Sequence, residues 1–203
     1  MKRFLPLSLL GILLAGCGWW PREFVSNPDP NHTHADFAVW VNGEKLDFSA
    51  NELMSGSSSE EKGEDHGHEH LHPYLHLHDG VGYVIHRHKP GLTFKEFFDS
   101  LQVGFDAQCY VSFAPMADGF ICGDTPFRMF VNGKEQPFDL EYVFADTDQI
   151  LLTNAGSEAQ LKKEFEAMTT DACLYSRTCP WRGEPPKESC IADPDVPCLE
   201  ALP

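Results

Sequence analysis

Histidine is the residue whose type and spacing carry the clearest chemistry in this chain. Most of its ten histidines occur as His-x-His pairs, in which one residue separates two imidazoles. Residues i and i+2 of an extended strand point to the same face, so each pair can direct two imidazoles at one point. Imidazole nitrogen is a good ligand for zinc and for copper(II). The pattern therefore predicts a site for one of these two ions.

The ordered part of this site is expected on strands. Its predicted ligands are His32, His34, His76, His78, His86 and His88. Between two of these pairs, Asp79-Gly80 favours a tight reversal that would bring the pairs together. Six imidazoles exceed the four ligands of a tetrahedral zinc, so either two ions bind or some histidines lie outside the ligand shell. Asp36 and Asp79 are candidates for direct ligands or for carboxylates that orient a ligating histidine.

A second group of histidines lies at the end of residues 51–72, which are rich in serine, glycine and glutamate and predict a mobile loop. The alternating histidines of this loop are predicted as accessory ligands, and they are His66, His68, His70 and His72. An acidic, histidine-rich loop resembles the loops of zinc-uptake binding proteins. The resemblance implies weak collection of metal near a tighter site.

The N-terminal residues 1–17 predict export. Lys2 and Arg3 precede a short apolar segment that is too short for a membrane span. The segment ends in Leu14-Ala15-Gly16-Cys17, which resembles a bacterial lipobox and implies lipidation of Cys17. The alternative is an ordinary signal peptide that ends in cysteine. Residues 18–30 then form a tether, and the expected location is extracytoplasmic, anchored to a membrane by lipid and facing the periplasm or the cell surface.

Charge and cysteine content narrow the function classes. The formal net charge is −16, and no basic stripe is present, which argues against nucleic-acid binding and favours cations as partners.

Apart from Cys17, an even number of cysteines in an exported chain predicts structural disulfides, with Cys109 expected to pair with Cys122. The others are Cys173, Cys179, Cys190 and Cys198. No C-x-x-C occurs, so neither a redox motif nor a zinc ribbon is supported.

The elements that would position the histidines are predicted by turn and periodicity signals. Asn42-Gly43 and Asn132-Gly133 each predict a type I′ hairpin. Thr93 and Glu96 form the capping box of a helix with a phenylalanine-rich face. Together with predicted strands at residues 80–88 and 149–153, they indicate an α+β fold.

The predicted domain is a single small mixed sheet of about five strands with one packed helix. The segment from Val131 to Asn154 is similar to the last strands of ubiquitin-like folds, which implies a β-grasp-like arrangement. A C-terminal helix and a disulfide-rich tail follow. The expected divisions are 31–154 for the histidine-rich domain, 155–172 for the helix and 173–203 for the disulfide-stapled tail.

Three enzyme motifs are matched in part. Residues 68–72 read H-E-x-x-H, but that motif acts on a helix, and here it lies in an alternating tract between Gly67 and Pro73. Residues 32–36 resemble the H-x-H-x-D of metallo-hydrolases, although Phe37 stands where the next histidine is expected. Paired histidines also resemble cupins, whose glutamate and glycine spacing is missing. These departures favour a carrier over an enzyme.

Longer blocks point to a family. HTHADFAVWVNGEKLDFS, LHLHDGVGYVIHRHKPGLTFKEFFDSLQV and RMFVNGK together resemble a family of uncharacterised histidine-rich exported bacterial (lipo)proteins. We therefore expect a lipid-anchored protein that captures, buffers or delivers zinc or copper(II), with a transporter or a recipient metalloprotein as its partner. The alternatives are a metal-dependent, hydrolase-type enzyme, and a structural or adhesion lipoprotein whose histidines are incidental or sense pH.

Overall fold

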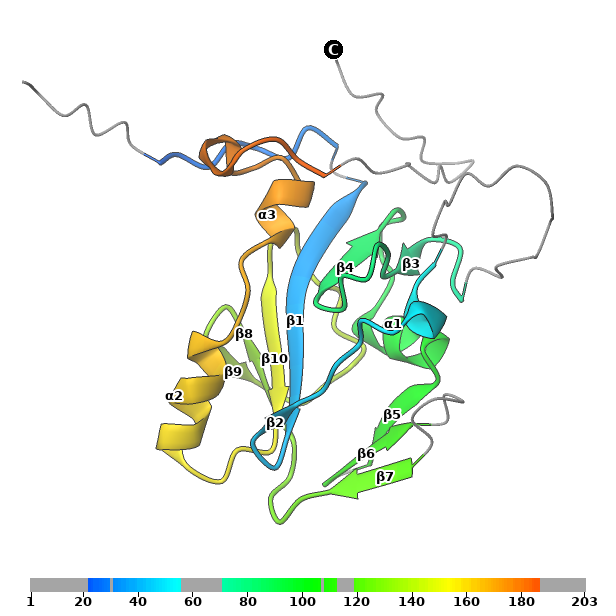
Figure 1. The fold of residues 1–203 in the computed structure, drawn as a ribbon, viewed down its shortest axis with the longest axis vertical. Coiled ribbons are helices and arrows are strands. Elements are labelled where there is room, and N and C mark those ends of the chain that lie inside the picture. Colours follow the sequence, from blue (N-terminus) through cyan, green and yellow to red (C-terminus); the bar gives the residue numbers. More distant parts are fainter. Residues whose placement is uncertain (1–21, 30, 56–70, 107, 113–118, 187–203) are drawn as a thin grey trace, which may run out of the picture.

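The computed structural model describes residues 22–29, 31–55, 71–106, 108–112 and 119–186. This part of the chain is mixed α+β, with two sheets and a few short helices (Figure 1). Within these residues, no helix is both long enough and apolar enough to cross a membrane.

The larger sheet has seven strands in the order β3-β4-β1-β10-β8-β9, and β2 pairs with β1. Its strands are β1 (Thr33–Val41), β2 (Glu44–Lys45), β3 (Leu75–His76), β4 (Val84–Arg87), β8 (Arg128–Val131), β9 (Lys134–Gln136) and β10 (Gln149–Thr153). Strands β1 and β10 lie side by side in parallel, whereas all other pairs are antiparallel. A smaller sheet contains β5 (Val103–Asp106), β6 (Cys109–Ser112) and β7 (Gly119–Cys122).

Both predicted hairpin turns are confirmed. Asn42 and Gly43 have φ angles of 54° and 81°, and Asn132 and Gly133 have φ angles of 51° and 74°. Positive φ at both central residues is the requirement of a type I′ turn, and asparagine followed by glycine meets it at low cost. The first turn joins β1 to β2, and the second joins β8 to β9.

The central strand β1 is buried on both faces, and a different helix covers each. On one face Phe37 contacts the phenylalanines of α1 (Phe94–Ser100), whose N-terminus has the predicted capping box of Thr93 and Glu96. On the other face Trp40 clusters with Leu161 of α2 (Glu158–Glu166). The expectation of one helix over the sheet was therefore incomplete, because the helix predicted after residue 155 closes the second face (Figure 1).

The C-terminal region departs from its predicted boundaries. Helix α2 ends at Glu166 rather than continuing to residue 172, and a short helix α3 (Ala172–Tyr175) follows it. Two 3-10 turns complete the description, η1 (Asn51–Leu53) and η2 (Pro180–Arg182). The ends of the predicted 51–72 loop are thus ordered in part, since η1 precedes a β-bridge between Met54 and Leu77.

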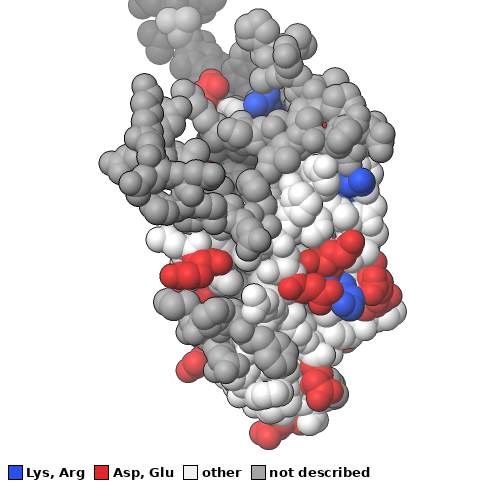
Figure 2. All heavy atoms as spheres, turned by 90° about the vertical axis from the view of Figure 1, so that its right-hand side faces the viewer, with Lys and Arg blue, Asp and Glu red and all other residues white. Residues whose placement is uncertain are grey.

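Two disulfides lie in the described chain. Cys109 pairs with Cys122, as predicted, across neighbouring positions of β6 and β7, and Cys173 pairs with Cys179. The remaining three cysteines, Cys17, Cys190 and Cys198, lie outside the described residues. On the face shown in Figure 2, acidic side chains are more prominent than basic ones, in keeping with the net charge of −16.

Candidate metal centre

Three adjacent strands place the predicted histidines on one face of the sheet. His76 of β3 lies opposite His86 of β4, and His86 lies opposite His34 of β1. The three imidazoles therefore form a row across the strands. His88, His32 and His78 are each two residues from a member of this row, so alternation keeps them on the same face.

The reversal that brings β3 and β4 together is the predicted Asp79-Gly80 turn. Asp79 and Gly80 have φ angles of 57° and 71°, and the N–H of Val81 donates to the carbonyl of His78 at 3.0 Å. Strand β4 begins at Val84 rather than at residue 80, because residues 79–80 and 82–83 form turns.

The six histidines form one continuous cluster. The ring centroids of His32 and His88 are 4.1 Å apart, and those of His34 and His86 are 4.7 Å apart. The His76 ring lies 4.9 Å from the His88 ring and 6.0 Å from the His86 ring. Four of the six are buried, whereas His32 and His78 are half-buried at its rim. All six residues predicted as ordered ligands are therefore brought together.

One close nitrogen pair joins His32 and His34, whose Nε2 atoms are 3.2 Å apart. The Ser176 hydroxyl lies 2.7 Å from Nδ1 of His34 and donates its own hydrogen to Oδ1 of Asp146. The serine oxygen must therefore accept a hydrogen bond from the Nδ1–H group of His34, which leaves the lone pair of His34 on Nε2. This places the metal-binding atom of His34 toward His32.

A second close pair joins His78 and His86, with Nε2 of His78 3.2 Å from Nδ1 of His86. Oδ2 of Asp79 lies 2.6 Å from Nδ1 of His78 and, as a carboxylate oxygen, accepts a hydrogen bond from the Nδ1–H group. The lone pair of His78 is thus on Nε2, directed at His86. Asp79 occupies the role expected for it, a carboxylate that orients a histidine.

The nitrogen positions fit a divalent ion. Zinc–nitrogen bonds of 2.0–2.1 Å put neighbouring donors of a tetrahedron about 3.3 Å apart, close to the 3.2 Å of both pairs. His32, His34 and His86 also each offer a donor atom within 4.8 Å of the other two. A metal-bound histidine is usually supported by a hydrogen-bond acceptor that contacts the N–H group of its other ring nitrogen.

Helix α3 covers the cluster with residues that sequence reasoning missed. The Tyr175 ring lies edge-on to His86 at 4.8 Å and 5.6 Å from the His34 ring, while Ser176 contacts His34. Both residues lie inside the loop closed by the Cys173–Cys179 disulfide. The cysteine spacing predicted disulfides in the tail, but no sequence signal indicated which surface the disulfide-closed segment covers.

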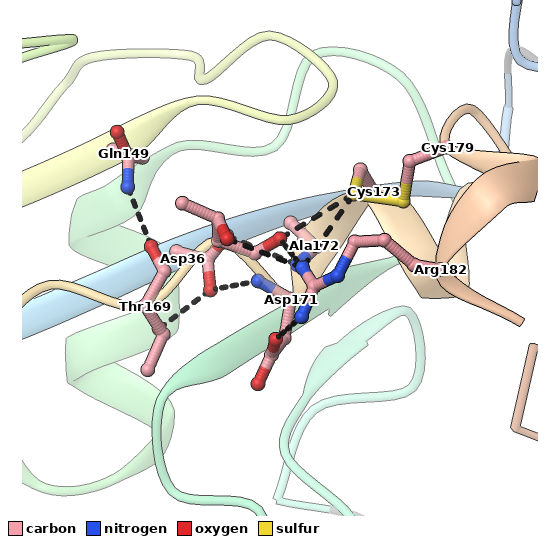
Figure 3. A network of polar contacts seen from close by, with 9 residues as sticks. Asp36, Gln149, Thr169, Asp171, Ala172, Cys173, Cys179 and Arg182 are labelled. Carbon is pink, nitrogen blue, oxygen red and sulfur yellow. Dashed lines mark hydrogen bonds and ion pairs between the residues drawn. A yellow bond between two sulfur atoms is a disulfide. The ribbon is translucent and has the colours of Figure 1, made fainter. Parts of the chain in front are cut away.

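Asp36 has a different role from the one predicted. Its oxygens accept hydrogen bonds from the Thr169 hydroxyl at 2.6 Å and from the main-chain N–H groups of Asp171 and Ala172 at 2.9 and 3.0 Å. These bonds fix the start of α3, as Figure 3 shows. Burial raises the pKa of the Asp36 carboxyl, and the hydrogen bonds act in the opposite direction. Asp36 therefore supports the helix that covers the histidines and does not orient a ring directly.

Of the accessory tract, only His72 is described. Its Nδ1 accepts the main-chain N–H of Tyr74 at 3.1 Å, and burial lowers its pKa, an effect opposed by Glu96. His72 is thus ordered beside α1 rather than part of a mobile tract. His66, His68 and His70 lie outside the described residues.

A cavity of about 620 Å³ lies beside α3, lined by Asp36, Cys173 and Arg182 among others. Among the residues that the structure describes, no histidine lines it. This cavity is therefore not a substrate pocket built on the histidine cluster. Comparisons with known protein families, curated proteins and solved structures find no significant match.

Proposed function

We propose that this protein binds zinc or copper(II) through the six-histidine cluster and serves to capture, buffer or deliver the ion. The observation that carries the proposal is the Asp146–Ser176–His34 chain, which holds one imidazole with its lone pair directed at a second imidazole nitrogen 3.2 Å away. Zinc and copper(II) accept such ligands, and affinity alone would favour copper.

A carrier is favoured over an enzyme by two features of the described chain. The cavity next to Asp36 has none of the described histidines in its lining, so it is not a substrate pocket around the candidate metal ligands. Asp36 itself, the carboxylate of the H-x-H-x-D match, is engaged by the start of α3. Four of the six histidines are buried, which favours retention of the ion over rapid exchange.

The location is also a proposal. We propose a lipid-anchored, extracytoplasmic protein, and the two disulfides support an oxidising compartment. The acidic surface supports attraction of cations toward the site. A membrane transporter or a recipient metalloprotein would be the partner in delivery. The block resemblance to histidine-rich exported bacterial proteins supports the same assignment.

We further propose that the fold is β-grasp-like. The support is the parallel pair β1 and β10 at the centre of the sheet, with β2 and β4 on one side and β8 and β9 on the other. In this arrangement α1 is the helix packed across the sheet. The fold itself carries no statement about metal.

The test of metal binding is equilibrium dialysis of the tag-free chain against zinc and against copper(II), followed by metal analysis. We expect at least one tightly held ion at neutral pH. A His34→Ala variant should hold less metal than the wild-type chain, whereas a His72→Ala variant, whose ring lies outside the cluster, should hold as much. Sub-stoichiometric metal in the wild-type protein, or equal retention in both variants, would refute the proposal.

A further inference from the structure

The histidine cluster contains two oriented imidazoles rather than one. His34 is fixed by Ser176 and Asp146, and His78 is fixed by Asp79. The two supports come from different parts of the chain, and each directs an Nε2 lone pair at another imidazole nitrogen. A single tetrahedral ion would need only one such arrangement, and it would leave two of six imidazoles outside its ligand shell.

His86 lies between the two oriented rings. Its Nδ1 is 3.2 Å from Nε2 of His78, and the residue also belongs to the triad with His32 and His34. It is fully buried, at 0% exposure, in the middle strand of the three. An imidazole has two nitrogens on different sides of the ring, so one such residue can serve two ions.

Resting on the metal-binding function proposed above, we infer that the cluster holds two divalent ions that share His86. The first centre comprises His32, His34 and His86. The second comprises His78 and His86, with His76 the nearest further imidazole, its ring centroid 5.9 Å from that of His78. His88 stacks on the rings of His32 and His76.

The proton balance of this arrangement is simple. Neutral His86 carries one ring proton, so it binds the first ion through its other nitrogen. When the second ion binds, that proton leaves to solvent, and His86 becomes a bridging imidazolate whose negative charge lies between the two cations. His34 and His78 keep their Nδ1 protons, which stay hydrogen-bonded to Ser176 and Asp79, and neither metal changes oxidation state. Repulsion between the ions makes the second bind more weakly than the first.

The experiment counts ions in the full chain. Because His66, His68 and His70 would add weak sites, they are first replaced by glutamine, and all variants are made in this background. Dialysis against zinc followed by metal analysis should give two ions per chain. His78→Ala should retain one ion, His32→Ala should also retain one, and His86→Ala should weaken both.

A second readout tests the sharing of His86. Two copper(II) ions on one imidazolate are magnetically coupled, so their ordinary electron paramagnetic resonance signal is depressed at full loading. His78→Ala should restore the signal of an isolated copper(II) ion. Near- and far-ultraviolet circular dichroism checks that each variant folds; if His86→Ala does not, the two single variants still decide the count.

The outcomes separate this inference from the proposal on which it rests. One zinc per chain, unchanged by His78→Ala, would overturn the two-centre inference and leave metal binding intact. Two ions without magnetic coupling would overturn the sharing of His86. No tightly bound ion in the background protein would refute the proposed function itself.

Discussion

Replacing Ser176 with alanine removes the hydroxyl that accepts a hydrogen bond from the Nδ1–H group of His34. The hydroxyl lies 2.7 Å from Nδ1 and donates a hydrogen bond to Asp146. Without it, the His34 ring loses the contact that sets its tautomer and its orientation. Asp146 keeps the main-chain N–H of His34, 3.1 Å away, so the local backbone stays supported. The substitution therefore acts on the ligand and leaves the strand in place.

The expected loss follows from the role of such supports. Removing a partner that orients a metal-binding histidine lowers metal affinity by roughly 10- to 100-fold. This corresponds to about 1.4–2.8 kcal/mol of binding free energy. Two hydrogen bonds of the hydroxyl are also lost, one with His34 and one with Asp146, which lowers the free energy of unfolding of the metal-free chain by about 1–3 kcal/mol.

The assay is competition for zinc between the protein and a chromogenic chelator at neutral pH. Ser157→Ala is the matched control, because Ser157 caps α2 by accepting from the N–H of Gln160 and lies away from the histidines. It should cost about 1 kcal/mol of stability and leave zinc affinity unchanged. If Ser176→Ala binds zinc as tightly as the wild-type chain, the tautomer argument is wrong.

Three further predictions concern the scaffold. Phe97→Ala should lower the free energy of unfolding by about 3–5 kcal/mol in denaturant titration, since this ring of α1 is fully buried against Phe37 of β1. A loss below about 1 kcal/mol would contradict the packing. Replacing Cys173 and Cys179 by serine should lower the free energy of unfolding by about 2 kcal/mol and, because α3 is held less firmly, weaken zinc binding. Unchanged zinc affinity would show that α3 does not support the site. Burial and Asp148 raise the pKa of the Tyr142 phenol, so the folded chain keeps a proton that the unfolded chain loses as pH rises beyond about 10. Between pH 9 and 11, thermal melts should therefore show a smaller loss of stability for Tyr142→Phe than for the wild-type chain, because the variant lacks this titrating group. A larger loss in the variant would refute this.

Local features of the fold were predictable because they depend on neighbouring residues. The Asn-Gly turns, the Thr93 capping box and the Asp79-Gly80 reversal each need only a few adjacent side chains. The same holds for the His-x-His alternation, which put His34 and Asp36 on the face opposite Phe37. The six histidines of the cluster were predicted from this two-residue alternation alone.

The features that sequence reasoning missed are contacts between distant segments. Ser176 reaches His34 across 142 residues, and Asp36 reaches Ala172 across 136. No periodicity or motif links such positions, so the covering of the cluster by α3 and the true role of Asp36 were not accessible. The β5–β7 sheet was likewise only half predicted, through the Cys109–Cys122 pair.

X-ray absorption spectroscopy of the zinc-loaded chain tests the central claim most directly, because it reports the atoms bound to the ion. The account predicts a first shell of nitrogen at about 2.0–2.1 Å, with the outer-shell scattering of imidazole rings. That pattern should weaken in His34→Ala and persist when His66, His68 and His70 are replaced. A first shell dominated by oxygen, or an imidazole pattern that vanishes with the tract, would contradict binding at the cluster.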